Sequence, residues 1–167
     1  MALSLSACGG SSTTTAAEEE VVVTPVAPVA LTADSDVFTG TAGDDTFTAT
    51  DTTLTATDVI AGGDGADTLT LTAAAGAGVA APASMTAVET YNVVLNSFAT
   101  ETVDAANVIG AAINVSNAQV GGATSVTVNH INSTSSLTVA DTFTGTLTVT
   151  GAGTVNAGSA ATVASTL

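Results

Sequence analysis

The sequence predicts an all-β protein whose short, Thr-rich strands stack as a parallel β-solenoid or Ca²⁺-bound β-roll, with a β-sandwich as the alternative. Threonine alternates with large apolar residues in segments such as "ADTLTLT" and "DTFTGTLTVT", and this period of two is typical of strands with one buried face. Large side chains are scarce, with four Phe, one Tyr and no Trp in 167 residues. A narrow solenoid interior, filled by small aliphatic side chains, suits that composition better than a sandwich core does.

Residues 1–32 predict an N-terminal export segment or tether followed by a flexible linker. The only cysteine, Cys8, lies in "LSAC" and precedes "GGSSTTTAAEEE". This arrangement resembles the lipobox of bacterial lipoproteins, so Cys8 is a candidate for lipidation, and a lipid there is the one membrane attachment that we expect. Seven residues precede Cys8, without a basic segment or a full apolar segment, which departs from a complete signal peptide. Pro25 and Pro28 favour an extended linker.

The rest of the chain predicts two β segments, residues 33–83 and residues 84–167. The first holds acidic, glycine-rich turns followed by Thr-rich strands. It ends in the low-complexity stretch "AAAGAGVAAPAS", which predicts a loop. The second holds short strands at close, irregular spacing, which is typical of a small sandwich or of solenoid rungs. These strands are expected to begin near Ile113, Val126, Leu137, Leu147, Thr154 and Thr162.

The charge composition restricts the partners. All fifteen charged residues are acidic and the formal net charge is −15, while charged residues make up 9% of the chain, against roughly 25% in ordinary domains. Carboxylates without internal cations repel one another, and low pH, salt or a bound metal would relieve that repulsion. Nucleic acid is excluded as an expected partner, because no side chain can neutralise a phosphate. The alternative is that the acidity only keeps an extracellular protein soluble.

One short stretch carries the clearest chemistry. Residues 62–70, "GGDGADTLT", match at every fixed position the nonapeptide G-G-x-G-x-D-x-U-x, which is associated with calcium-binding β-rolls. A second copy, "GTAGDDTFT", lies 22 residues upstream at residues 40–48 and departs from the pattern only at Thr41. Two motifs at this spacing predict that one loop stacks above the other, with Phe47 and Leu69 pointing into the core.

The residue types in these motifs suit calcium. Glycines allow positive φ angles, and therefore tight turns with carbonyl oxygens directed inward. Calcium takes six to eight oxygen ligands at about 2.3–2.6 Å, which carbonyl groups and Asp carboxylates supply. The alternative is that both motifs are ordinary Asp/Gly turns. The expected metal-site residues are Gly40, Thr41, Gly43, Asp44, Asp45, Gly62, Gly63, Asp64, Gly65 and Asp67.

Other polar residues give weaker signals. His130, the only histidine, has no second ligand nearby in the sequence, so we expect a strand or turn residue. No catalytic constellation is present, and the chain is not expected to be an enzyme. The aspartates that flank the motifs could add oxygen ligands, but we expect solvent-facing turn residues at these positions, which are Asp34, Asp36, Asp51 and Asp58.

Residues 31–72 resemble the calcium-binding segments of bacterial RTX proteins, in particular RTX-type surface-layer proteins. The shared elements are a start at residues 39–47 that is similar to T-x-G-x-D-D-x-F, a Thr-rich strand, and a D-x-I-x-G-G-x-G-x-D-x-L finish at residues 58–69. The later strands are similar to the β-strand repeats of those proteins. The resemblance implies an extracellular protein of the bacterial cell surface in which Ca²⁺ orders the fold and drives assembly. Such proteins commonly carry many nonapeptides, whereas this chain carries two.

Two hypotheses follow for the function. The first is a calcium-binding structural protein that self-assembles into a surface layer, fibre or matrix, with further copies of itself as the partner. The second is a secreted adhesin or binding module that uses flat, Thr-rich β faces, such as an ice-binding or carbohydrate-binding module. Long threonine ladders in register would favour the second hypothesis, and the irregular strand spacing argues against it.

Overall fold

The chain forms a parallel β-solenoid. The computed structural model describes residues 28–74, 76, 78–96, 100–118, 125–140, 143, 145–151, 153–157 and 162–166. This part of the chain contains fourteen strands and no helix. Cys8 and most of the expected linker lie outside the described residues.

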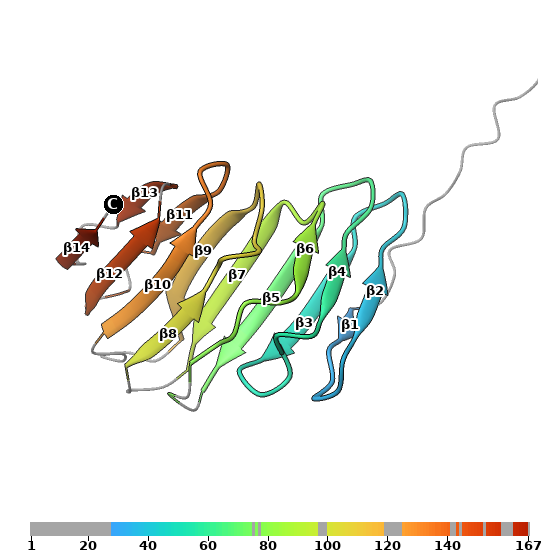
Figure 1. The fold of residues 1–167 in the computed structure, drawn as a ribbon, viewed down its shortest axis with the longest axis horizontal. Helices are drawn as coiled ribbons and strands as arrows, with labels where there is room; N and C mark the ends of the chain where they lie inside the picture. Colours follow the sequence, from blue (N-terminus) through green and yellow to red (C-terminus); the bar gives the residue numbers. More distant parts are fainter. Residues whose placement is uncertain are drawn as a thin grey trace, which may run out of the picture.

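One wall of the solenoid is a seven-stranded sheet, seen as the rear layer in Figure 1. Every neighbouring pair in it is parallel. The strand order β1-β3-β5-β7-β9-β11-β13 takes every second strand of the chain, as expected when each turn adds one strand to this wall. The strands are β1 (Val29–Ala30), β3 (Thr46–Thr50), β5 (Thr68–Ala73), β7 (Thr90–Leu95), β9 (Ala112–Asn117), β11 (Ser136–Val139) and β13 (Thr154–Ala157).

The opposite wall consists of two shorter parallel sheets, which form the front layer in Figure 1. The first has the order β2-β4-β6 and the second β14-β12-β10-β8. Isolated parallel bridges, Val79 to Val103 and Met85 to Val108, continue these ladders beyond the named strands. The strands are β2 (Val37–Thr39), β4 (Val59–Ala61), β6 (Ser84–Thr86), β8 (Glu101–Asp104), β10 (Ser125–Ile131), β12 (Thr146–Gly151) and β14 (Thr162–Thr166).

The register of the seven-stranded sheet is regular at first and then varies. Thr46, Thr68, Thr90 and Ala112 are successive partners, so each of these turns takes 22 residues. The next partner of Ala112 is Ser136, so the later turns differ in length. The connecting loops absorb this variation, and the strands stay in register.

The core follows from the alternation of residues along each strand. Inward positions form a column of stacked apolar side chains, and every second residue faces outward. One such column, at most 2% exposed, contains Phe47, Leu69, Tyr91, Ile113 and Leu137. Phe47 and Leu69 therefore point into the core as the motifs predicted.

The structure decides between the two folds that the sequence left open. A sandwich of this size is built from antiparallel strands, whereas all the strand pairs in the described sheets are parallel. The sandwich alternative is wrong. The strands expected in the second segment are all present, and "AAAGAGVAAPAS" has no helix in its described residues.

One core residue gives a test of the packing. The Tyr91 side chain is 1% exposed, and its hydroxyl has no hydrogen-bond partner. Burial raises the pKa of this phenol well above its usual range. An unpaired buried hydroxyl costs about 1–3 kcal/mol, so we expect Tyr91→Phe to raise the free energy of unfolding by about 1 kcal/mol in chemical denaturation.

The matched variant is Tyr91→Leu, which also removes the hydroxyl but leaves a cavity, and it should destabilise the protein. A loss of stability in Tyr91→Phe would contradict this, because it would mean that the hydroxyl has a hydrogen-bond partner in the core.

Candidate functional site

The two glycine–aspartate loops lie one directly above the other at the same corner of the solenoid. The Gly40 N–H donates to the Ala61 carbonyl oxygen at 2.7 Å, and the Asp64 N–H donates to the Thr41 carbonyl oxygen at 3.2 Å. The Ala66 N–H donates to Asp44 Oδ1 at 2.9 Å. The 22-residue spacing of the motifs therefore equals one turn, and it brings both sets of predicted residues together.

The glycines have two different roles. Gly63 and Gly65 have φ angles of 107° and 125°, which side chains disfavour. Gly62 is required for space, because a Cβ atom there would lie 1.7 Å from the Ala87 carbonyl oxygen. Gly40 is equally confined, because a Cβ atom there would lie 1.7 Å from the Gly62 carbonyl oxygen. The motif thus allows backbone segments of successive turns to approach closely.

A ladder of three carboxylates connects successive turns at this corner. The Asp45 N–H donates to Asp67 Oδ1 at 2.7 Å. The Asp67 N–H donates in the same way to Glu89 Oε2 at 2.8 Å. Each of these three residues immediately precedes a strand of the seven-stranded sheet. A charge-assisted bond to a carboxylate is stronger than an ordinary one, so these side chains fasten each turn to the one before it.

Sequence reasoning missed Glu89 as a member of this ladder. The available signal was its position 22 residues after Asp67, which repeats the interval between Asp45 and Asp67. Glu89 itself is exposed, while Asp45 and Asp67 are 5% and 0% exposed.

A second ladder corrects one of the sequence-based expectations. The Asp36 N–H donates to Asp58 Oδ1 at 3.0 Å, and Asp58 Oδ2 accepts the Thr55 N–H at 2.7 Å. Asp58 is completely buried, so the prediction of a solvent-facing residue is wrong there. The reason is that its carboxylate replaces missing backbone partners at a corner. Asp36 and Asp51 are half-buried, and Asp34 is exposed as predicted.

Asp67 differs from the other carboxylates of its corner. Its Oδ2 atom is buried and has no hydrogen-bond partner. Burial raises the pKa of this carboxyl group, the hydrogen bond from the Asp45 N–H lowers it, and the carboxylates of Glu89, Asp45 and Asp44 raise it further. The group therefore favours a proton or a cation.

The difference between the two motifs explains the unpaired oxygen. Asp45 Oδ2 accepts the N–H of Thr41 and also its hydroxyl, the latter at 3.0 Å. The position equivalent to Thr41 in the second motif is Gly63, which has no hydroxyl and whose N–H does not donate to Asp67 Oδ2. In the first motif, Thr41 thus supplies both hydrogen-bond donors to Asp45 Oδ2. In the second motif, Gly63 supplies none, and Asp67 Oδ2 has no donor.

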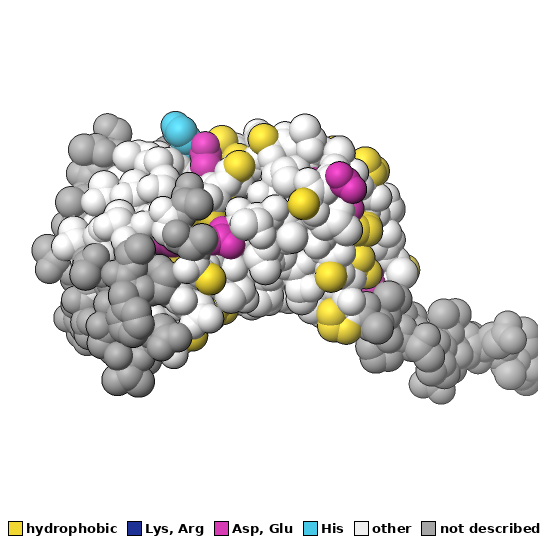
Figure 2. Space-filling model, turned by 90° about the horizontal axis from the view of Figure 1, so that it is seen from below, with side chains coloured by type: hydrophobic (Ala, Val, Ile, Leu, Met, Phe, Trp, Pro, Cys, Tyr) yellow, Lys and Arg dark blue, Asp and Glu magenta, His cyan; other side chains and the backbone are white. Residues whose placement is uncertain are grey.

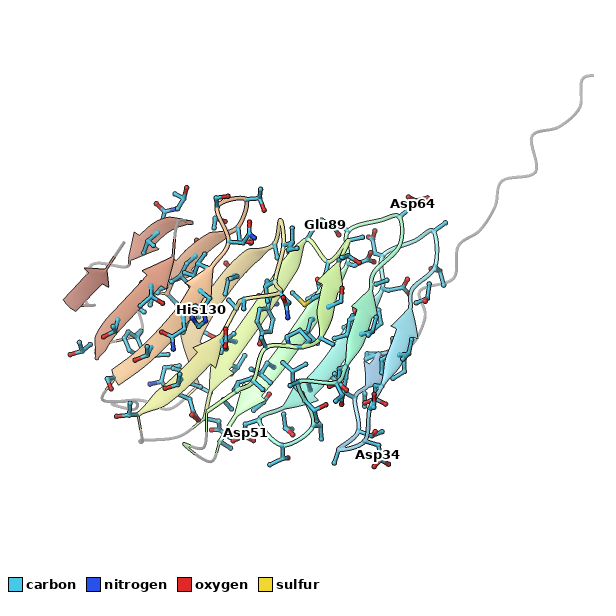
Figure 3. The ribbon with its side chains drawn as sticks, viewed as in Figure 1. Asp34, Asp51, Asp64, Glu89 and His130 are labelled. Carbon is cyan, nitrogen blue, oxygen red and sulfur yellow. The ribbon has the colours of Figure 1, made fainter. Side chains whose placement is uncertain are left out.

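The corner offers oxygen atoms of the kind that calcium binds, namely the unpaired Asp67 Oδ2 and the Ala87 carbonyl oxygen, which both lie against Gly62. Several predicted ligands already have other roles, because one oxygen of Asp44, Asp45 and Asp67 each accepts a backbone N–H. Asp64 lies exposed at the loop tip, at the same edge as Glu89 in Figure 3. Within the described ranges, no three His, Cys, Asp or Glu side chains gather as a metal-holding group.

Two further acidic residues lie on β8. Asp104 Oδ1 is 2.9 Å from His130 Nδ1, and His130 belongs to β10 with a φ angle of 57°, in agreement with its prediction as a strand or turn residue. The Glu101 side chain faces the core, 1% exposed. Its Oε1 accepts the Gly76 N–H at 2.9 Å, and its Oε2 has no partner. The alternation of Glu101 with Val103 was the available signal.

The strand topology and the acidic corners define the class of protein: it is a parallel β-solenoid with carboxylates at its turns. Comparison with known proteins adds no family: no family model, curated protein or solved structure matches the chain. The part of the chain that the structure describes contains no helix long and apolar enough to cross a membrane.

The raised pKa of Asp67 predicts a pH dependence of stability. An acid with a raised pKa in the folded state binds its proton more tightly when folded, so its protonation stabilises the fold as pH falls. In chelator, lowering the pH from 7 towards the usual pKa of Asp should therefore raise the contribution of Asp67 to the free energy of unfolding. Asp67→Asn should lack this contribution.

Denaturation at a series of pH values measures this difference between wild type and variant. Asp64→Asn, which removes an exposed carboxylate from the same loop, is the matched control and should retain the wild-type slope. Parallel pH profiles for wild type and Asp67→Asn would contradict the assignment.

Proposed function

We propose that this chain is a calcium-binding structural protein of the bacterial cell surface, which self-assembles into a surface layer, fibre or matrix. The observation that carries the proposal is the unpaired, buried Oδ2 of Asp67, with the carboxylates of Asp44, Asp45 and Glu89 close enough to raise its pKa. A divalent cation would neutralise this corner in a chain that has no Lys or Arg. The resemblance of residues 31–72 to RTX calcium-binding segments favours calcium as that cation.

The two motifs are not equivalent in this proposal. Thr41 supplies the donors that Asp45 Oδ2 needs, and Gly63 supplies none to Asp67. The first cation therefore binds against Asp67, with backbone carbonyls of the stacked loops as further ligands. Outside the cell, where calcium is abundant, binding completes the corner and rigidifies the turns.

The ends of the solenoid support self-assembly. β1 and β2 each have one partner strand in the described sheets, and β13 and β14 have one each at the other end. Parallel strands with an open edge can pair with another chain, and joining opposite ends of two copies gives a head-to-tail contact that propagates as a filament. Val37 on β2, at the first end, is 72% exposed and adds apolar surface to it.

A specific observation also favours the second candidate, a secreted adhesin or binding module. The outward residues of the seven-stranded sheet stay in register although the turn lengths vary, for example Asn114 with Thr138, and Thr138 with Asn156. Irregular strand spacing in the sequence therefore does not break the polar ladder. Attachment through a lipid on Cys8 is compatible with either candidate and remains a prediction.

Calcium titration of the full chain tests the first proposal. After treatment with chelator, added calcium should increase β-sheet ellipticity and resistance to denaturation, and light scattering should then grow. Asp67→Asn should weaken calcium binding in calorimetry at least tenfold, because it replaces an anionic ligand by a neutral one. Asp104→Asn, on the other side of the solenoid, should bind as the wild type does.

The outcomes separate the candidates. Ordering together with growth in particle size agrees with the structural protein, and ordering without growth favours the adhesin. No response of the wild type to calcium, or equal binding by Asp67→Asn, would contradict the proposed site.

A further inference from the structure

We propose that the outward face of the seven-stranded sheet is a lateral contact surface that binds the same face of a second copy of this chain. This inference rests on the proposed self-assembly. It names the surface for side-by-side contacts, which the open strand edges at the two ends do not provide. End-to-end pairing extends the solenoid in one direction, whereas a contact through this face joins neighbouring solenoids side by side.

Charged side chains are distributed unevenly between the seven-stranded face and the turns. The outward positions of the seven-stranded sheet carry no Asp or Glu in its described strands. The carboxylates lie instead at the turns, and Figure 3 shows Asp64 and Glu89 at one edge and Asp34 and Asp51 at the opposite edge. Figure 2 views the lower edge of Figure 1 from below and shows separate acidic side chains along that edge. The outward residues of the column at the strand starts are Thr46, Thr68, Thr90, Ala112, Ser136 and Thr154, and those of the next column are Thr48, Thr70, Asn92, Asn114, Thr138 and Asn156.

The strands hold the outward side chains of this face at fixed spacings. Neighbouring strands lie about 4.8 Å apart, and alternate residues along a strand about 6.6 Å apart, so the side chains form a two-dimensional array. Threonine is stiff at χ1, and the Asn114 amide donates to Asn92 Oδ1 at 3.1 Å. Little conformational entropy is lost when such a preorganised surface binds.

A second copy matches this surface in three respects. Its side chains have the same spacing along and between strands, because the same backbone ladder sets that spacing. Hydroxyl and amide groups both donate and accept hydrogen bonds, so the face is complementary to itself and suits a two-fold interface. Two chains of net charge −15 repel each other least where no carboxylates meet.

The size of the face is sufficient for a weak, specific contact. Seven strands of about five residues cover about 500 Å² per copy, so a dimer buries about 1,000 Å², the lower limit for a specific interface. The opposite wall fits less well, because Asp104 and His130 lie on it.

Sedimentation velocity of the full chain in calcium tests the inference with two matched variants. Thr70→Glu places a charge in the middle of the seven-stranded face, and Thr127→Glu places one on the opposite wall, between Thr102 and Thr148. Both positions are half-buried in central strands. Thr70→Glu should weaken lateral association at least tenfold, and Thr127→Glu should leave it within twofold of wild type.

Thr70→Asn is the second variant, because asparagine occupies the next position of the same column and should keep both fold and association. Circular dichroism then separates misfolding of Thr70→Glu from lost contact. Association of folded Thr70→Glu at the wild-type level would overturn the inference and leave the proposed function intact. Equal weakening by both Glu variants would also overturn it, and a wild type that stays monomeric in calcium would overturn the proposed function as well.

Discussion

The fold depends on how a chain without Lys or Arg supplies its carboxylates with hydrogen-bond partners at the corners of a solenoid. At one corner Asp67 accepts the backbone N–H of Asp45, and Glu89 accepts that of Asp67. The same interaction joins Asp36 to Asp58 at another corner. Buried backbone donors require partners, and the acidic side chains supply them. The acidity therefore serves the stacking of turns as well as solubility.

The sequence was sufficient for the strands, because Thr alternating with Leu, Phe or Val specifies one buried face. It was also sufficient for the stacking of the two motifs, since their interval equals one turn. It was not sufficient for Asp58, whose burial depends on the preceding turn of the chain. Glu89 could have been found from the 22-residue interval, whereas the partner of His130 lies 26 residues away and follows no repeat.

Glycine was the residue whose role the sequence described least completely. Positive φ angles explain Gly63 and Gly65, but Gly40 and Gly62 are needed because no Cβ fits between stacked loops. The close approach that they permit brings the carboxylates of successive turns together. Most of the charge is thereby concentrated at the edges and the seven-stranded face remains neutral, an arrangement that suits cation binding at the edges and contacts between copies on that face.

The most direct test is an NMR titration of the Asp67 carboxyl group, followed through its ¹³C chemical shift, first in chelator and then in calcium. We expect the pKa to lie above the ordinary value for Asp in chelator, because the carboxyl is buried among other carboxylates, and to decrease clearly when calcium binds. An ordinary pKa that calcium leaves unchanged would contradict it.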